Sequence, residues 1–289
     1  MTAAAPESLG FAPGQVLSGP VDLRLDASLV GCRVHYLPSV GSTNAVLRSL
    51  AEDGEPEGAV VVADEQTAGR GRAGRSWFSP RGKGLWLSVL LKPLRPAIDV
   101  APLSMVTAVS VAAVLRRDFG VDARVKWPND LVAGGRKLGG ILLESLQGAG
   151  GAVERVVVGI GLNVNLDARD VPSDIAGTAT SLRMLLGMDV SRLDVLRSVL
   201  DAFDEDWRKF ESDGVAGFLE RWRGLSTVLG RRIEIATDGE PGAGDARANA
   251  RERLVAGTAV DITPEGALVV EDGAGRRVQV WHGDVVTLE

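Results

Sequence analysis

The pattern of apolar residues changes near Leu229, and this change most limits how the chain can fold. Before that point several segments have helical spacing. The clearest is Ser191–Phe210, in which large apolar residues recur every three or four positions. Beyond it, short alternating segments separated by Gly, Pro and Asp predict strands. We therefore expect an α+β chain with an amino-terminal tail over 1–30, a large domain over 31–228 and a small β-domain over 229–289.

Local patterns predict the elements of both domains. In the large domain we expect a helix that Ser42 or Thr43 caps and that runs to about Glu52, and further helices over Leu103–Phe119, Ser191–Phe210 and Val215–Gly224. We expect strands over Ala59–Ala63, Leu85–Leu91, Arg124–Lys126, Lys137–Leu146 and Val156–Gly159, the last breaking at Gly161. In the small domain we expect a barrel or sandwich with strands over Arg232–Ala236, Thr258–Ile262, Ala267–Val270, Arg277–Val280 and Val285–Leu288. Residues 238–250, rich in Gly and Ala, predict a long hairpin insert, and the Gly and Pro residues of 1–20 predict a flexible or loosely docked tail.

Composition excludes several classes of protein. The formal net charge of −6 argues against a protein that mainly grips nucleic acid through a basic face. The chain has one cysteine and two histidines, so an internal disulfide is impossible and a Cys/His zinc site is not expected. The cysteine count favours a reducing, cytoplasmic compartment. No secretory signal or bilayer-spanning apolar stretch is visible, so no membrane partner is expected.

Residues 69–77 read Gly-Arg-Gly-Arg-Ala-Gly-Arg-Ser-Trp. Glycine permits close approach of a ligand to the backbone, and arginine provides a permanently charged fork suited to carboxylate and phosphate. We call these residues the arginine loop. Its composition suits a polyanion ligand, but a solvated basic loop or a nucleic-acid patch fits the run equally well.

Other polar segments could converge with the arginine loop on one pocket. Ser42, Thr43 and Asn44 stand at a helix start, where they can cap the helix or hold a polar heterocycle. Residues 126–130 place a cation, an aromatic ring, an amide and a carboxylate in one short run, and 136–141 bring two cations to paired glycines. No P-loop or complete dinucleotide fingerprint is present, so arginine and lysine side chains would hold any phosphate.

Together these segments resemble the biotin–protein ligase family, also called biotin–[acetyl-CoA-carboxylase] ligases. The resemblance covers about residues 31–289 and rests on motifs in the family's order: Ser42-Thr43-Asn44, Gln66, Gly69-Arg70-Gly71-Arg72, Gly74-Arg75, Trp77, Lys126-Trp127-Pro128-Asn129-Asp130, Arg136-Lys137-Leu138-Gly139-Gly140-Ile141 and Gly159-Ile160-Gly161-Leu162-Asn163-Val164-Asn165. It implies a catalytic domain similar to class II aminoacyl-tRNA synthetases, with a mixed sheet, followed by an SH3-like barrel.

The resemblance also implies an activity. Biotin and MgATP would form biotinyl-5′-AMP, and the biotin would pass to one lysine of an acceptor such as the carboxyl carrier domain of acetyl-CoA carboxylase. Biotin, ATP and this acceptor are the implied partners, and Mg²⁺ is the implied cofactor. Only about 30 residues precede the catalytic domain, so the helix-turn-helix domain of bifunctional members, and DNA binding with it, are not expected.

By resemblance, each motif residue has an expected role. Lys137 and Arg72 are the expected catalytic residues, and Asp130 is the expected metal ligand. The expected biotin-binding residues are Ser42, Thr43, Asn44, Gln66, Arg70, Gly71, Arg72, Trp86 and Lys137, with Leu85 and Ser88 beside Trp86 as further walls. The expected ATP-binding residues are Arg70, Arg72, Trp77, Asn129, Lys137 and Asn163. The arginine loop is expected to close over bound ligand.

Two rival functions remain at this point. A lipoate–protein ligase shares the fold and the acyl-adenylate chemistry, although 126–130 and the arginine loop favour biotin. A biotin- or nucleotide-sensing protein that binds nucleic acid is the second rival, and the acidic net charge weighs against it.

Overall fold

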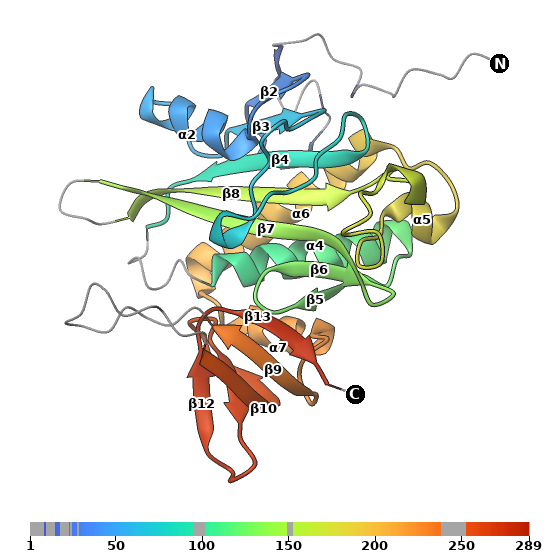
Figure 1. The fold of residues 1–289 in the computed structure, drawn as a ribbon. Helices are drawn as coiled ribbons and strands as arrows, with labels where there is room; N and C mark the ends of the chain where they lie inside the picture. Colours follow the sequence, from blue (N-terminus) through green and yellow to red (C-terminus); the bar gives the residue numbers. More distant parts are fainter. Residues whose placement is uncertain are drawn as a thin grey trace, which may run out of the picture.

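The computed structural model describes residues 9, 15–17, 23, 25–27, 29–94, 102–148, 153–237 and 253–288. Two sheets organise these residues, an eight-stranded one in the large domain and a five-stranded one near the carboxyl terminus (Figure 1). The expected α+β architecture, with a mixed sheet followed by a smaller antiparallel one, is confirmed.

The large sheet has the strand order β1-β2-β3-β4-β8-β7-β6-β5. Its strands are β1 (Val16–Leu17), β2 (Val34–Leu37), β3 (Val60–Ala63), β4 (Gly84–Leu91), β5 (Arg124–Lys126), β6 (Asp130–Ala133), β7 (Arg136–Gln147) and β8 (Val153–Asn163). Strands β2 and β3 run parallel, and every other neighbouring pair is antiparallel. All residues of β3 and β4 are buried because both faces of the sheet are covered there.

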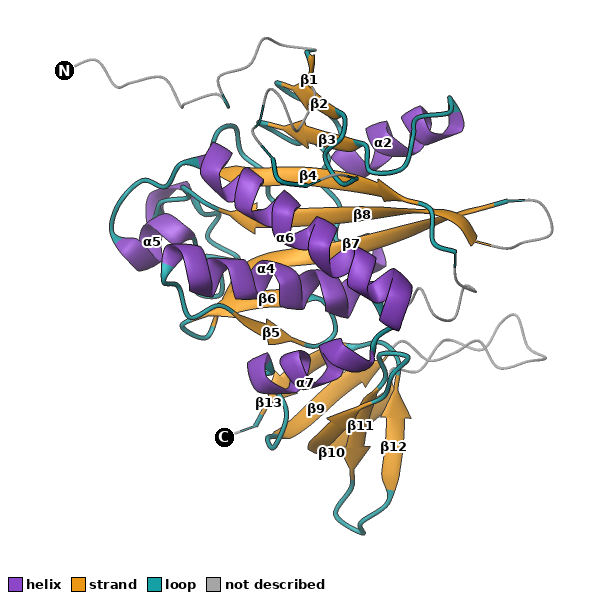
Figure 2. Ribbon diagram, turned by 180° about the vertical axis from the view of Figure 1, so that it is seen from behind, coloured by secondary structure: helices purple, strands orange, loops and turns teal. Residues whose placement is uncertain are grey.

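Helices cover the sheet unequally. The helices are α2 (Thr43–Glu52), α4 (Leu103–Phe119), α5 (Leu182–Leu186), α6 (Arg192–Asp213) and α7 (Ala216–Leu225), with short 3₁₀ turns at Arg72–Gly74 and Ala168–Asp170. The long helices α4 and α6 pack side by side over one face, as Figure 2 shows. The apolar stripe of α6, including Phe203, Trp207 and Phe210, is buried in the main core, as its spacing predicts. The opposite face carries α2 and the arginine loop (Figure 1).

The small sheet has the order β12-β11-β10-β9-β13. Its strands are β9 (Arg232–Thr237), β10 (Arg253–Ile262), β11 (Leu268–Glu271), β12 (Arg277–Val280) and β13 (Asp284–Thr287). It is tied to the large domain where the Trp127 indole N–H donates to the Gly266 carbonyl at 3.0 Å. The expected insert at 238–250 lies outside the described residues.

The amino-terminal segment differs from expectation where it is described. Strand β1 pairs antiparallel with β2 and forms the edge of the large sheet. Leu9, Leu17, Leu23 and Leu25 are buried in the main core. These leucines give the segment apolar surface to bury, so it is not loosely docked at these positions, and a domain start at residue 31 leaves out part of the sheet.

Strand β8 also differs from expectation, because the predicted break at Gly161 does not occur. The strand continues to Asn163, and Gly161 pairs with Trp86 on one side and Gly140 on the other. Gly161 therefore does not turn the chain. It leaves the surface of the sheet without a side chain at this position. Among the described helices, none combines the length and apolar character needed to cross a bilayer.

Candidate active site

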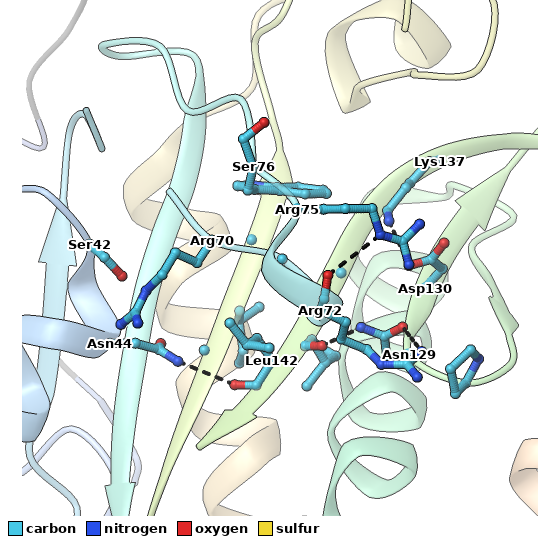
Figure 3. A pocket seen from close by; sticks show the side chains of 18 of the residues that line it. Ser42, Asn44, Arg70, Arg72, Arg75, Ser76, Asn129, Asp130, Lys137 and Leu142 are labelled. Carbon is cyan, nitrogen blue, oxygen red and sulfur yellow. Dashed lines mark hydrogen bonds and ion pairs between the residues drawn. The ribbon is translucent and has the colours of Figure 1, made fainter. Parts of the chain in front are cut away.

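A cavity of about 380 Å³ opens on the sheet face that carries the arginine loop, opposite α4 and α6 (Figure 3). This volume lies within the range of about 300–1,000 Å³ typical of small-molecule sites. The sequence-predicted residues on its wall are Ser42, Thr43, Asn44, Gln66, Arg70, Gly71, Arg72, Trp77, Asn129, Asp130 and Lys137. Segments far apart in the sequence thus meet at one site, as the motifs predict.

One end of the cavity, which we call the amide end, is formed by Thr43, Asn44 and Gln66. Gln66 Oε1 accepts hydrogen bonds from the Thr43 backbone N–H at 2.9 Å and from Thr43 Oγ1 at 3.1 Å. It therefore caps α2, whereas Ser42, expected as a cap, makes no side-chain capping bond. An amide carries two N–H donors and only one goes to Ser79 Oγ at 3.0 Å, so Gln66 retains donor capacity.

Ser88 supports the amide end from behind. Its Oγ is fully buried and lies 2.8 Å from Thr43 Oγ1 and 2.6 Å from Asn44 Oδ1. Asn44 in turn donates through Nδ2 to the Leu142 carbonyl at 3.4 Å, as Figure 3 shows. This buried network fixes neutral donors and acceptors before any ligand arrives.

The opposite end, which we call the charged end, is formed by Arg72, Asn129, Asp130 and Lys137. Lys137 Nζ lies 2.7 Å from Asp130 Oδ1, and Arg72 Nη1 donates to Asn129 Oδ1 at 3.2 Å. The hairpin β6–β7 carries both residues: Asp130 begins β6 opposite Gly140, and Lys137 follows the Gly134-Gly135 turn, from where its side chain reaches Asp130 (Figure 3). Burial is the main cause that lowers the pKa of the Arg72 guanidinium from its usual value, which still leaves it charged at neutral pH.

The other arginines of the loop, Arg70 and Arg75, form ion pairs with Glu144 and Asp284. Arg70 reaches toward Asn44 at the amide end, and its Nη1 pairs with Glu144 at 3.4 Å (Figure 3). Arg75 pairs with Asp284 of β13 at 2.8 Å, so the loop contacts the small sheet. Arg70 therefore serves the amide end, whereas Arg75 lies beside Arg72 and donates through Nε to the Arg72 carbonyl at 3.5 Å (Figure 3).

Trp77 closes the arginine loop and lies flat on glycines. A Cβ on Gly161 would stand 2.6 Å from its indole nitrogen, and one on Gly140 would stand 3.6 Å from its ring. Lys137 Nζ lies 5.2 Å from the ring centroid, within reach of a cation–π contact. The indole N–H is buried and has no hydrogen-bond partner among the described residues, which leaves one donor unused at this wall.

Trp86 and Asn163, predicted to contact biotin and ATP respectively, do not line the cavity. Trp86 is fully buried behind Trp77, with the two ring centroids 6.5 Å apart and the rings nearly perpendicular. Asn163 is buried and donates to the Thr180 carbonyl at 2.9 Å. The Thr180 N–H in turn donates to the Lys137 carbonyl at 2.9 Å, so Asn163 supports the Lys137 backbone from a distance.

The strand after the arginine loop also contributes differently from expectation. Leu87 lines the cavity, whereas Leu85 and Ser88 do not. Sequence reasoning also missed Leu142 and, from the small sheet, Asp284 and Val285. No local sequence signal could have identified Asp284 and Val285 as cavity residues, because their distance from the cavity depends on how the two domains pack.

The described residues of the cavity could supply only some of the ligands of a metal ion. Among the described residues no three His, Cys, Asp or Glu side chains stand together as a metal site. Asp130 is the carboxylate at the charged end, and its partner is Lys137. This donor set suits Mg²⁺, which commonly takes one or two carboxylates and fills its remaining positions with waters and substrate phosphates.

Comparisons with known proteins agree with this site. Residues 36–163 match the model of the Biotin/lipoate A/B protein ligase family. The chain is 31% identical to the Bifunctional ligase/repressor BirA of Bacillus subtilis over 94% of this chain and 79% of that protein. It is 33% identical to the Biotin–[acetyl-CoA-carboxylase] ligase of Mycobacterium tuberculosis over 94% of this chain and 97% of that protein.

Among solved structures, the biotin protein ligase of Aquifex aeolicus in complex with biotin and ATP is similar. It superposes with a TM-score of 0.72 at 28% identity, covering 88% of this chain and 98% of that one. Sequence similarity over nearly the whole chain, the shared fold and the cavity formed by the predicted motifs lead to one conclusion: the chain belongs to the biotin protein ligase family.

Proposed function

We propose that this protein is an ATP-dependent ligase that activates biotin as biotinyl-5′-AMP and transfers it to one lysine of an acceptor protein. The biotin carboxyl carrier domain of a biotin-dependent carboxylase is the proposed acceptor. Relatives named biotin–[acetyl-CoA-carboxylase] ligase support this acceptor, and the Aquifex aeolicus complex with biotin and ATP supports the substrates. The repressor activity in the name of the Bacillus relative is not part of the proposal.

One observation carries the proposal: a single cavity joins a neutral hydrogen-bonding end to a cationic end. Biotin has the same division, with a neutral ureido group at one end and a carboxylate at the other. The amide end offers fixed hydroxyl and amide groups to the ureido group, and the charged end offers Lys137 and Arg72 to the carboxylate and the α-phosphate.

The roles of individual residues follow from these positions. Thr43, Asn44 and Gln66, with Ser42 at the rim, hold the ureido group, and Arg70 and Gly71 cover the bound biotin. Lys137 and Arg72 neutralise the two anions that must meet, because unit charges about 4 Å apart repel by about 4 kcal/mol near a protein surface. Asn129 and Trp77 contribute to the nucleotide end.

The proposed reaction proceeds in two steps. A biotin carboxylate oxygen attacks the α-phosphorus, the bond from that phosphorus to the bridging oxygen breaks, and pyrophosphate leaves. The lysine amine, having lost a proton, then attacks the acyl carbon, the bond from that carbon to the phosphate oxygen breaks, and AMP leaves with one further proton released from nitrogen. The arginine loop and Trp77 exclude water from the anhydride between these steps.

We propose Mg²⁺ as the metal that accompanies ATP, with Asp130 as its protein ligand. When bound it neutralises phosphate charge, which adds to the effect of Lys137 and Arg72. Lys137, which pairs with Asp130 at 2.7 Å, would then share Asp130 with the ion or leave it for the α-phosphate.

Three further assignments belong to this proposal. The large domain, 31–228 with the docked amino-terminal strand, is proposed to be of the class II aminoacyl-tRNA synthetase type. The small sheet, 229–289, is proposed to be SH3-like. A cytoplasmic setting agrees with the single cysteine, Cys32.

Biotin-dependent exchange of pyrophosphate with ATP tests the activity. We expect exchange with biotin and at most weak exchange with lipoate, because the amide end places fixed polar groups where a dithiolane ring can make no hydrogen bonds. Exchange with lipoate alone would overturn the proposal and favour the lipoate ligase that shares the family model.

A further inference from the structure

A second cavity, of about 230 Å³, lies beside the first and has no part in the steps described above. Its walls come from the start of α4 at Met105, from the turn at 127–129, from Leu143 of β7 and from Glu265 and Trp281 of the small sheet. It therefore lies between the two domains, where ligand sites are common.

The two cavities share a wall. Six residues line both of them: Arg72, Trp127, Pro128, Asn129, Ile141 and Leu142. On this wall the Arg72 guanidinium donates to the Asn129 amide at 3.2 Å. Arg72 is the long, flexible side chain among these residues, so a change of its rotamer is the movement that a passage between the two cavities would require.

Glu265 gives the second cavity a carboxylate that no described residue pairs with. It is partly buried, and no described residue forms a hydrogen bond or ion pair with it. Arg72 is the cationic side chain on the same walls, and the proposed function engages Arg72 with the acyl phosphate of the bound adenylate. Once that happens, Glu265 remains as the charge that faces an incoming group, and it favours a cation.

Apolar side chains complete the second cavity. Trp281, in the connection between β12 and β13, is 53% exposed although it is a large apolar residue, and Met105 and Ile262 form part of the same lining. A long aliphatic stem that ends in an ammonium group fits this combination, because lysine side chains lay their methylenes on apolar surface and keep the charge at a polar partner. The amino-terminal turn of α4 beside it suits the backbone carbonyls of the same bound segment.

We propose that the second cavity is the port through which the acceptor's lysine reaches the adenylate. Trp281 packs against the lysine stem, Glu265 attracts its ammonium group, and Arg72 leaves Asn129 to admit the amine. This inference rests on the proposed function. It makes Glu265 and Trp281 residues of acceptor recognition, with no role in adenylate formation.

The test compares the two half-reactions in Glu265→Gln and Trp281→Ala. We expect each variant to raise KM for an apo carboxyl carrier domain about tenfold, which corresponds to about 1.4 kcal/mol. We expect adenylate formation from biotin and ATP, and capture of the adenylate by free hydroxylamine, to stay within about twofold of the parent, since a small nucleophile needs no port. Glu234→Gln and Leu254→Ala are matched controls, because both residues belong to the small sheet and line neither cavity.

A disulfide-trapping experiment places the lysine directly. With Cys32, the single cysteine, changed to Ser, Glu265→Cys is expected to cross-link to an acceptor whose target lysine is replaced by cysteine, whereas Glu234→Cys is not. An unchanged KM for the acceptor in both variants, or cross-linking equal at the two positions, overturns the port. A raised KM for ATP with unchanged transfer also overturns it, because the second cavity would then belong to the nucleotide site. If the parent forms no biotinyl adenylate, the proposed function itself fails.

Discussion

The two ends of the active-site cavity are built in different ways. At the amide end, Ser88, Thr43 and Asn44 are buried, and short hydrogen bonds join them. At the charged end, Lys137 and Asp130 are 39% and 24% exposed and form an ion pair that a ligand can replace. The comparison indicates that one end is preorganised for recognition, whereas the other keeps charges available for a reaction in which anions come and go.

The largest expected effect comes from removing the central cation of the charged end. Lys137→Ala should slow adenylate formation by about 10²–10³-fold, as for the loss of one preorganised stabilising group. The free energy of unfolding should change by less than about 1 kcal/mol, because the pair with Asp130 is exposed.

Single-turnover formation of biotinyl-5′-AMP measures this effect. Lys209→Ala is the matched control, because Lys209 forms an exposed pair on α6. An unchanged adenylation rate in Lys137→Ala would refute the claim that the charged end provides the charges for the reaction.

The next effect concerns the surface that supports the arginine loop. Gly161→Ala should place a methyl group 2.6 Å from the Trp77 indole nitrogen, and the indole must move. A displacement of about 1 Å near reacting groups can cost about 10²-fold in rate, so we expect adenylation to fall by about 10–100-fold. Tryptophan fluorescence should change in parallel.

Gly224→Ala is the matched control for this glycine. A Cβ there meets nothing within 4 Å, and Gly224 lies inside α7, so this change should leave the rate unaltered and stabilise the helix slightly. An adenylation rate in Gly161→Ala equal to that of the parent would contradict the claim that Trp77 must pack on a strand surface without side chains.

A smaller effect is expected at the shared wall. Arg72→Gly removes the contact with Asn129 and one cation of the charged end, so the adenylate should dissociate about tenfold faster or more. The measurable consequence is nonspecific labelling of bystander proteins by released adenylate. Retention equal to that of the parent would count against Arg72 as a guard of the intermediate.

A substitution that weakens the amide end should change the binding of biotin and not the rate of the reaction. Ser88→Ala leaves the buried Asn44 Oδ1 without its donor, at a cost of about 1–3 kcal/mol in the free energy of unfolding. Because Ser88 does not line the cavity, KM for biotin should rise by less than about tenfold with kcat nearly constant. A large loss of kcat with an unaltered KM would contradict a recognition role for this end.

The smallest effect on catalysis is expected at Tyr36, which supports the amide end from a greater distance. Its hydroxyl donates to Asp64, two residues before Gln66, and Asp64 also pairs with the buried Arg192 at 2.8 Å. Burial and the Asp64 carboxylate raise the pKa of Tyr36 to about 12. Tyr36→Phe should cost about 1–3 kcal/mol in the free energy of unfolding, with little change in kcat.

The pH dependence of this effect has a defined sign. A raised pKa means that the folded protein holds the Tyr36 proton more tightly, so its contribution is complete below about pH 10 and is lost as pH rises toward about 12. Denaturant unfolding of parent and Tyr36→Phe should therefore converge over this range. A difference that grew with pH would contradict the hydrogen bond to Asp64.

Local signals predicted much of the fold. Helix α4 matches its expected bounds, Leu103–Phe119, because an apolar run ends at Gly120, which adopts a left-handed φ of 66°. The short helix α5 at Leu182–Leu186 was not predicted, since five residues carry too little periodicity. The break expected at Gly161 was wrong because glycine has two uses, to turn the chain and to leave room for a neighbour, and Trp77 takes up that room.

For the site, too, the sequence predicted which residues meet at the cavity better than it predicted which of them line its wall. Motif residues such as Lys137, Arg72 and Gln66 meet at the cavity, as predicted. Asn163, a motif residue, and Trp86, on the strand after the arginine loop, instead support the Lys137 backbone and Trp77 from behind. Their roles as ligand contacts were predicted from position along the chain, which cannot distinguish a wall of a cavity from the layer behind it.

One measurement tests the central claim most directly: incubation of the protein with ATP, Mg²⁺, biotin and an apo carboxyl carrier domain, followed by intact mass of the acceptor. We predict a mass increase of one biotin amide on one lysine, dependent on ATP and abolished or strongly reduced in Lys137→Ala. An acceptor of unchanged mass, or one that gains lipoate in place of biotin when both are offered, would contradict the account.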